Sequence, residues 1–203
     1  MRVLKQLFLA VGLLSVISAA QATSVSFNFS PTGLGTIDGS YYYKWGVNPS
    51  GLPTDMGITS ATLTYNNMKL TTFGNNNPGI LWTHLLNTSS GSGTTSYTRV
   101  SDSDAGTDAF SGQGVLLGKE LFPTLNVARN NSYNLDVTTL STYLADGHFA
   151  IGIDPDCYYT DSSIVLNITY SSLPPQGVPD FGSTAMLLGI ALPLLGIFRR
   201  ARG

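Results

Sequence analysis

Polar and apolar side chains alternate along several short stretches in the middle of the chain. Residues 24–29 read Ser-Val-Ser-Phe-Asn-Phe, and residues 164–170 repeat the alternation with a single interruption at Val165. Successive side chains of a β-strand point to opposite faces of its sheet, so this pattern predicts strands that are buried on one face. Both stretches are therefore expected to be half-buried strands of a packed sheet.

Other apolar stretches of strand length are separated by clusters of turn-forming residues, such as Asn-Asn-Asn-Pro-Gly at 75–79. They are residues 41–47, 58–65, 68–73, 80–85, 96–100, 115–117 and 148–153. Only 11% of the residues are charged and 42% are hydrophobic, a composition that can bury a core. We predict an all-β fold in which residues 23–172 form a single β-sandwich ectodomain of jelly-roll type.

One short stretch has helical rather than strand spacing. Within residues 136–144, Val137, Leu140, Tyr143 and Leu144 stand at i, i+3, i+6 and i+7. Side chains at these intervals line one side of an α-helix. We expect a single short helix that buries this stripe and closes one end of the sandwich.

The first 22 residues have the three parts of a secretory signal peptide. Arg2 and Lys5 form a positive patch, residues 7–17 are apolar, and Ala20 and Ala22 supply the small side chains of an A-x-A site. This layout predicts a signal helix that signal peptidase removes after Ala22. An uncleaved membrane anchor is the alternative, which the short apolar run disfavours.

The last 26 residues, 178–203, follow a proline-rich linker at 173–177 and end in an arginine cluster. Within them, residues 183–198 would form an apolar helix roughly 24 Å long at about 1.5 Å per residue. The hydrocarbon core of a bilayer is about 30 Å thick, and snorkelling arginines with local thinning can make up the difference. We predict a transmembrane helix here with the arginines in the cytoplasm and residues 23–178 outside. A buried core helix is the alternative.

The order of these parts resembles the PEP-CTERM class of bacterial sorting signal, especially its VPDSG-CTERM variant. The residues that carry the resemblance are Val178, Pro179, Asp180, Gly182, Ser183 and Thr184 before the apolar run and Arg199, Arg200 and Arg202 after it. The resemblance implies that the chain is a substrate of exosortase, an intramembrane transpeptidase-like cysteine enzyme of Gram-negative bacteria that make exopolysaccharide. It further implies an inner-membrane intermediate and a final place at the cell surface or in the matrix of a biofilm.

Charge is distributed unevenly, because both ends are basic and the middle is acidic. Between residues 23 and 178 there are 5 basic and 11 acidic side chains, which gives 5 − 11 = −6. Nucleic-acid binding requires a basic face that neutralises phosphates. We therefore expect no nucleic acid among the partners.

Aspartates near the end of the body form a candidate calcium site. Asp154 and Asp156 flank Pro155, with Asp161 close behind, and Ca²⁺ is bound by carboxylate and carbonyl oxygens. The alternative is a solvated turn in which an aspartate caps the backbone. The acidic loop at residues 102–108 lacks the ligand spacing of an EF-hand and is interpreted as an ordinary loop. No other cofactor is expected.

Aromatic side chains suggest a second kind of site. Tyr41, Tyr43 and Trp45 alternate along one predicted strand and so share a face, and Trp82 lies on another strand. Exposed, these rings could stack on sugars and make the chain a carbohydrate-binding module. The alternative places them in the core of the sandwich.

Motifs of catalysis are not evident in the sequence. His84 and His148 have no partner at a fixed spacing, and Glu120 is the only glutamate. A glycosidase would have to draw its carboxylate pair mainly from aspartates, so an extracellular hydrolase is the weakest alternative. We expect a non-enzymatic, exported protein.

Overall fold

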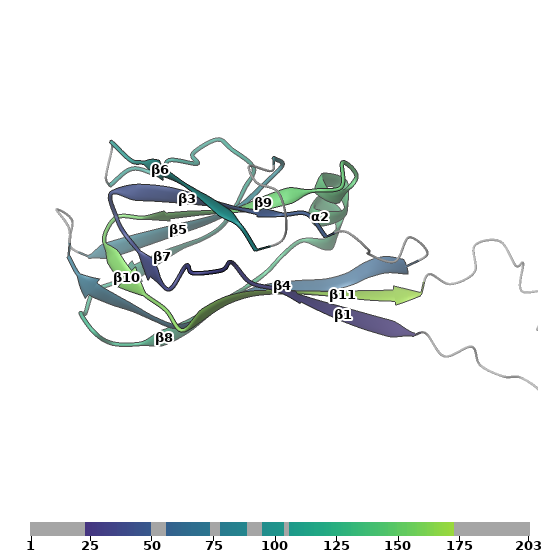
Figure 1. Cartoon of the computed structure of the whole chain (residues 1–203), viewed down its shortest axis with the longest axis horizontal. Helices are drawn as coiled ribbons and strands as arrows, with labels where there is room; N and C mark the ends of the chain where they lie inside the picture. Colours follow the sequence, from purple (N-terminus) through teal and green to yellow (C-terminus); the bar gives the residue numbers. More distant parts are fainter. Residues whose placement is uncertain (1–22, 50–55, 74–77, 89–94, 104–105, 173–203) are drawn as a thin grey trace, which may run out of the picture. The chain divides into compact units, whose positions relative to one another are not determined.

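Two antiparallel sheets, stacked as two layers, make up the body of the chain (Figure 1). The computed structural model describes residues 23–49, 56–73, 78–88, 95–103 and 106–172. Within these residues the first sheet contains β1 (Ser24–Phe29), β2 (Thr36–Ile37), β4 (Met56–Thr72), β8 (Arg129–Asn134), β10 (Tyr158–Thr160) and β11 (Ser163–Ser172). The second contains β3 (Tyr41–Val47), β5 (Gly79–Leu86), β6 (Tyr97–Ser101), β7 (Val115–Phe122) and β9 (Phe149–Pro155).

The chain passes back and forth between the two sheets. In the first sheet β11 lies between β1 and β4, and β8 pairs with the other edge of β4. In the second sheet the order is β6-β3-β9-β5-β7. The prediction of an all-β body is confirmed, and the orders β1-β11-β4-β8 and β3-β9-β5-β7 are consistent with a jelly roll.

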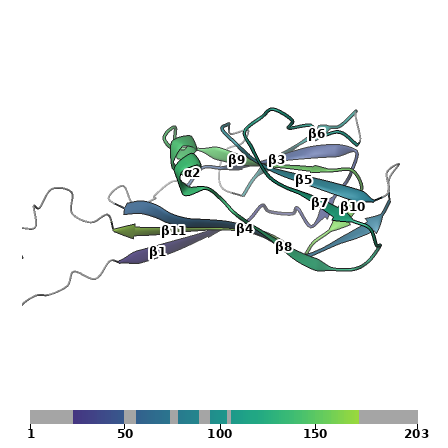
Figure 2. The ribbon, with the colours of Figure 1, turned by 180° about the vertical axis from the view of Figure 1, so that it is seen from behind.

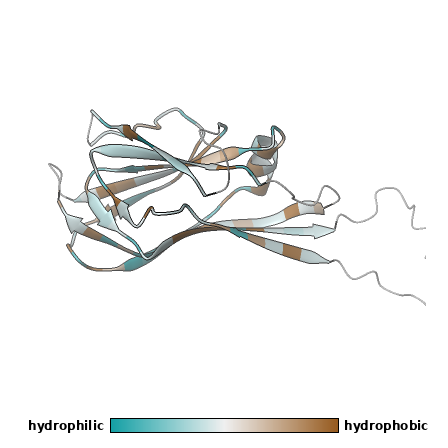
Figure 3. Ribbon diagram, viewed as in Figure 1, coloured by the Kyte–Doolittle hydropathy of each residue, from teal (hydrophilic) through white to brown (hydrophobic). Residues whose placement is uncertain are grey.

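Three strands lie where the sequence predicts them. β1 and β3 have the predicted bounds, and in β11 every second side chain from Ile164 to Tyr170 is buried. Figure 3 shows hydrophobic and hydrophilic residues following one another along the strands of both layers. The inward side chains form one core between the sheets, which includes Trp45, Tyr65, Leu63, Phe149, Ile151 and Leu166.

Two stretches predicted as separate strands, 58–65 and 68–73, form one strand in the structure. β4 runs unbroken through Asn66 and Asn67, and its pairing with β8 shifts register between Tyr65 and Met68. Asn67 lies at this irregularity and has a φ of 50°. Its backbone amide donates a hydrogen bond to Asn130 Oδ1 at 2.8 Å. The two asparagines therefore mark a bulge within a strand, and the prediction of two separate strands was wrong.

The predicted helix is confirmed as α2 (Val137–Leu144), beside β9 in both views (Figures 1 and 2). Asp136 caps its N-terminus by accepting a hydrogen bond from the Thr139 amide at 2.7 Å. Leu140 is buried in the core, and Tyr143 and Leu144 pack against it. None of the helices in the described part of the chain is long and apolar enough to cross a bilayer. The predicted signal helix and the predicted helix at 183–198 lie outside the described residues.

Candidate functional site

A loop between β6 and β7 covers the outer face of the second sheet. Its anchor is Phe110, which is fully buried and packs edge-on against Tyr42 of β3, with ring centroids 5.3 Å apart. Its ring also lies 5.7 Å from that of His84 in β5. Gly152 of β9 leaves room for it, since a Cβ there would be 2.9 Å from the Phe110 ring. As a result, β9 is buried on both faces.

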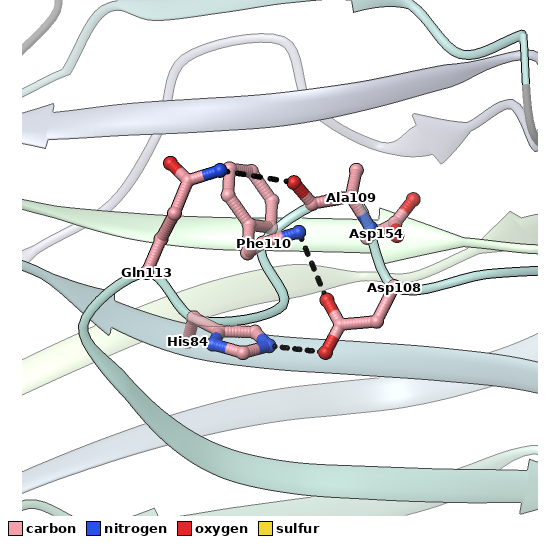
Figure 4. Close-up of polar contacts among 6 residues, drawn as sticks. All are labelled: His84, Asp108, Ala109, Phe110, Gln113 and Asp154. Atoms are coloured by element: carbon pink, nitrogen blue, oxygen red, sulfur yellow. Dashed lines mark hydrogen bonds and ion pairs between the residues drawn. The ribbon is translucent and has the colours of Figure 1, made fainter.

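Polar contacts hold this loop in place (Figure 4). His84 Nε2 lies 3.0 Å from Asp108 Oδ2, and the other oxygen of Asp108 accepts a hydrogen bond from the Phe110 amide at 2.9 Å. The Gln113 side chain donates to the Ala109 carbonyl at 3.1 Å. His84 is only 3% exposed, so the pair clamps the loop to β5 beneath the surface.

Asp154, at the end of β9, is buried beneath the same loop. It is 1% exposed, and its Oδ2 accepts a hydrogen bond from the Ala109 amide at 2.7 Å. Its Oδ1 is buried without a hydrogen-bond partner among the described residues. Burial raises the pKa of Asp154 to about 7, with smaller contributions from neighbouring carboxylates. These carboxylates belong to Asp102, Asp108 and Asp156.

Asp156 has a similar environment two residues further along. It is 4% exposed and accepts a hydrogen bond from the Gly106 amide of the loop. Within the described residues its Oδ2 is also buried without a partner. Burial raises the pKa of Asp156 to about 6, a shift that the positive charge of Lys119 opposes and the negative charge of Asp102 reinforces. Asp102 therefore acts on both buried carboxyls.

The structure separates Asp161 from this cluster, so the predicted trio Asp154, Asp156 and Asp161 is corrected. Between them the chain crosses through β10 from the second sheet to the first. Asp161 is half-buried there, and its charge acts on the hydroxyl of Tyr65 in the core. In the part of the chain that the structure describes, no three histidine, cysteine, aspartate or glutamate side chains are grouped so that they could hold a metal ion.

Three of the four rings proposed for sugar stacking are buried, and a guanidinium lies over the ring of the fourth. Tyr43 and Trp45 are 2% and 0% exposed, because these alternate side chains of β3 point into the core. Trp82 is 5% exposed, with the Lys119 ammonium 5.3 Å from its ring centroid. Tyr41 is half-buried, and the Arg99 guanidinium lies 4.2 Å from its ring centroid. Tyr43 and Trp45 belong to the core, as the alternative interpretation had it. The prediction that these two rings stack on sugars is therefore wrong.

Sequence reasoning missed the contact between His84 and Asp108. The two residues are 24 positions apart and carry no spacing typical of a site. Phe110 was not singled out either, although a lone aromatic in a polar loop is a signal for an anchor. The acidic loop was interpreted as an ordinary loop, and the burial of Asp154 and Asp156 beneath it is the part that only the fold shows.

The C-terminal residues match a known sorting motif. Residues 177–202 match the model of the VPDSG-CTERM motif. The chain carries a VPDSG-CTERM sorting signal. This confirms the resemblance expected from Val178, Pro179 and Asp180, and a VPDSG-CTERM signal implies processing by an exosortase-type machinery. The matched residues, like the predicted signal-peptidase site at Ala20 and Ala22, lie outside the described residues. No curated protein matches this sequence.

Proposed function

We propose that the chain is a non-enzymatic protein of the cell surface or extracellular matrix, delivered there by exosortase through its VPDSG-CTERM signal. The match of residues 177–202 to that motif carries the proposal. The family's link to exopolysaccharide-producing bacteria supports a place in the polysaccharide layer or biofilm. The exported part is the β-sandwich, and the C-terminal residues are the signal that directs it to the surface.

Sorting follows from the physical character of the two ends. The signal peptide starts translocation and is removed after Ala22. Residues 183–198 then stop in the inner membrane, because the charges of Arg199, Arg200 and Arg202 are costly to move through the bilayer core. With the helix stopped there, Val178, Pro179 and Asp180 lie at the periplasmic face of the inner membrane, where an intramembrane enzyme can cleave the chain. Cleavage then releases the body or transfers it to the surface.

A binding or structural role suits the body better than catalysis. Asp154 and Asp156, whose pKa values are raised by burial, are only 1% and 4% exposed, and His84 is 3% exposed. A general acid or base has to come within hydrogen-bond reach of its substrate. Carboxyls and an imidazole buried beneath a loop are better placed to hold that loop than to act on a soluble substrate.

The test compares cells that express the wild type with cells that express the double variant Pro179→Ala, Asp180→Ala. We expect the wild type in the surface and medium fractions in a shortened form. The double variant should accumulate in the inner membrane at its longer, uncut length.

A second double variant, Asn48→Ala with Ser103→Ala, serves as the control, because it alters two polar loop residues of the body and leaves the sorting signal intact. It should be processed like the wild type. Equal length and equal location of the wild type and the Pro179→Ala, Asp180→Ala variant would refute the proposal.

A further inference from the structure

Two buried carboxylates lie beneath the loop between β6 and β7, and each is only half satisfied. One oxygen of Asp154 and one of Asp156 accept amide hydrogen bonds from Ala109 and Gly106 of that loop. The second oxygen of each is buried and has no hydrogen-bond partner among the described residues. Residues two apart at the end of a strand share a face, so both carboxylates face the same loop.

The charged groups around Asp154 and Asp156 do not neutralise the negative charge of the two carboxylates. Lys119 acts on Asp156 across the sheet, whereas Asp102 adds negative charge to both carboxylates and Asp108 adds it to Asp154. A buried carboxylate oxygen without a partner costs free energy, because it gives up its hydration and gains nothing in exchange. A hard cation removes this cost directly, since it binds carboxylate oxygens and cancels their repulsion.

We propose that Asp154 and Asp156 bind a divalent cation of the calcium class beneath the loop, with Asp102 adding to its attraction. The cation fixes the loop to the end of β9, next to the clamp formed by His84 and Asp108. Two carboxylates are a minority of the six to eight oxygens that Ca²⁺ takes, so backbone carbonyls and waters complete its shell. Such a site does not need three grouped acidic side chains, in agreement with their absence among the described residues.

The competing explanation is that the two carboxyls remain protonated and bind no ion. Both explanations satisfy the buried oxygens, but they differ in what calcium does. A cation site gains stability as calcium is added, whereas a pair of neutral acids does not respond.

The experiment uses the purified full-length chain in detergent, stripped with EDTA and then titrated with Tb³⁺, a luminescent substitute for Ca²⁺. Trp82 pairs with Asp154 across β5 and β9, so its indole is placed to sensitise an ion bound there. CaCl₂ and MgCl₂ are added in separate arms to displace Tb³⁺. The unfolding midpoint is measured with and without CaCl₂ at about 10 mM, which exceeds the roughly 10⁻⁴–10⁻³ M dissociation constants of extracellular calcium modules.

We expect sensitised Tb³⁺ luminescence that calcium displaces and a higher unfolding midpoint in calcium. Asp154→Asn and Asp156→Asn should each weaken binding at least about tenfold, because each removes one of the two charged ligands. These variants are expected to fold, since each replaces a buried charge with a neutral side chain of the same shape. Asp161→Asn is the matched control and should bind like the wild type.

Absence of both luminescence and a calcium-dependent midpoint in the wild type would overturn the proposal, whatever the variants do. Full binding by Asp154→Asn and Asp156→Asn would overturn it as well, as would loss of binding in Asp161→Asn. Displacement by MgCl₂ at concentrations as low as those of CaCl₂ would replace calcium by magnesium as the bound ion. Sorting to the surface is measured separately and does not depend on any of these results.

Discussion

Asp161 shows how a single half-buried carboxyl sets a dependence of stability on pH. Its Oδ2 is buried without a hydrogen-bond partner among the described residues, and burial raises the pKa of Asp161 to about 6 from an ordinary value near 3.8. The fold therefore favours the protonated acid. Below about pH 4 the carboxyl is protonated in both the folded and the unfolded protein, and its burial does not lower the free energy of unfolding. As the pH rises toward 6 the unfolded protein loses this proton first, so the free energy of unfolding falls.

Asp161→Asn should remove this loss. At pH 7 we expect the variant to be more stable than the wild type by about 1–2 kcal/mol, a value reduced for the partial solvent exposure of the site. The difference should vanish near pH 4, and urea unfolding at several pH values measures it. Asp146→Asn, on an exposed side chain after α2, is the control and should show no such trend. A constant difference from pH 4 to pH 7 would contradict the assignment.

For single residues, the sequence predicts which side chains share a face of a strand, but it does not predict which groups surround them in the fold. Alternation correctly placed Tyr43 and Trp45 on one face of β3, but alternation does not say which face meets the other sheet. The pairing of His84 with Asp108 depends on a loop folding back across β5. No local pattern encodes a contact of that kind.

Asn67 in β4 shows how one backbone conformation lets a long strand continue. Its φ of 50° lies in the left-handed region, which asparagine and glycine adopt at low cost and β-branched residues do not. We expect Asn67→Val to lower the free energy of unfolding by about 1–2 kcal/mol relative to Asn67→Gly. Both variants lose the hydrogen bond from Asn67 Nδ2 to Ser162 Oγ, so the comparison isolates the backbone. Equal stability of the two variants, measured by urea unfolding, would show that the bulge is not strained by a branched side chain.

The elements fall into those that the pattern predicts and those that the packing imposes. β3, β11 and α2 follow their periodicity closely, since each buries one face. β1 also has its predicted bounds, although its apolar face is only partly buried at Phe27 and Phe29 and is exposed at Val25. β8 reads Arg-Asn-Asn-Ser-Tyr-Asn, and its polar residues gave no strand signal, yet pairing with β4 makes it a strand. β7 continues past its predicted end through Gly118, Lys119 and Glu120, because β5 supplies hydrogen-bond partners along its whole length.

For the whole chain, the C-terminal signal could be predicted from the order of residues in the sequence, whereas the contacts within the body depend on its fold. The sequence predicted the signal from the fixed order of motif, apolar run and arginines, and the match to residues 177–202 confirms it. The predicted sandwich is confirmed as two antiparallel sheets, but the acidic cluster beneath the loop depends on three-dimensional packing. Export and sorting could therefore be inferred without a structure. For ion binding, the sequence pointed to Asp154 and Asp156 but added Asp161, and the burial of the first two beneath the loop is visible only in the fold.

The ends of the mature protein provide the most direct test of export and sorting. Mass spectrometry of the intact protein, recovered from the surface and medium of cells that express the full gene, measures both ends at once. We predict a form that begins at Thr23 and ends close to Val178, Pro179 and Asp180, without the apolar run and the arginines. A full-length form in the cytoplasm, with Met1 and Gly203 both present, would contradict the central claim.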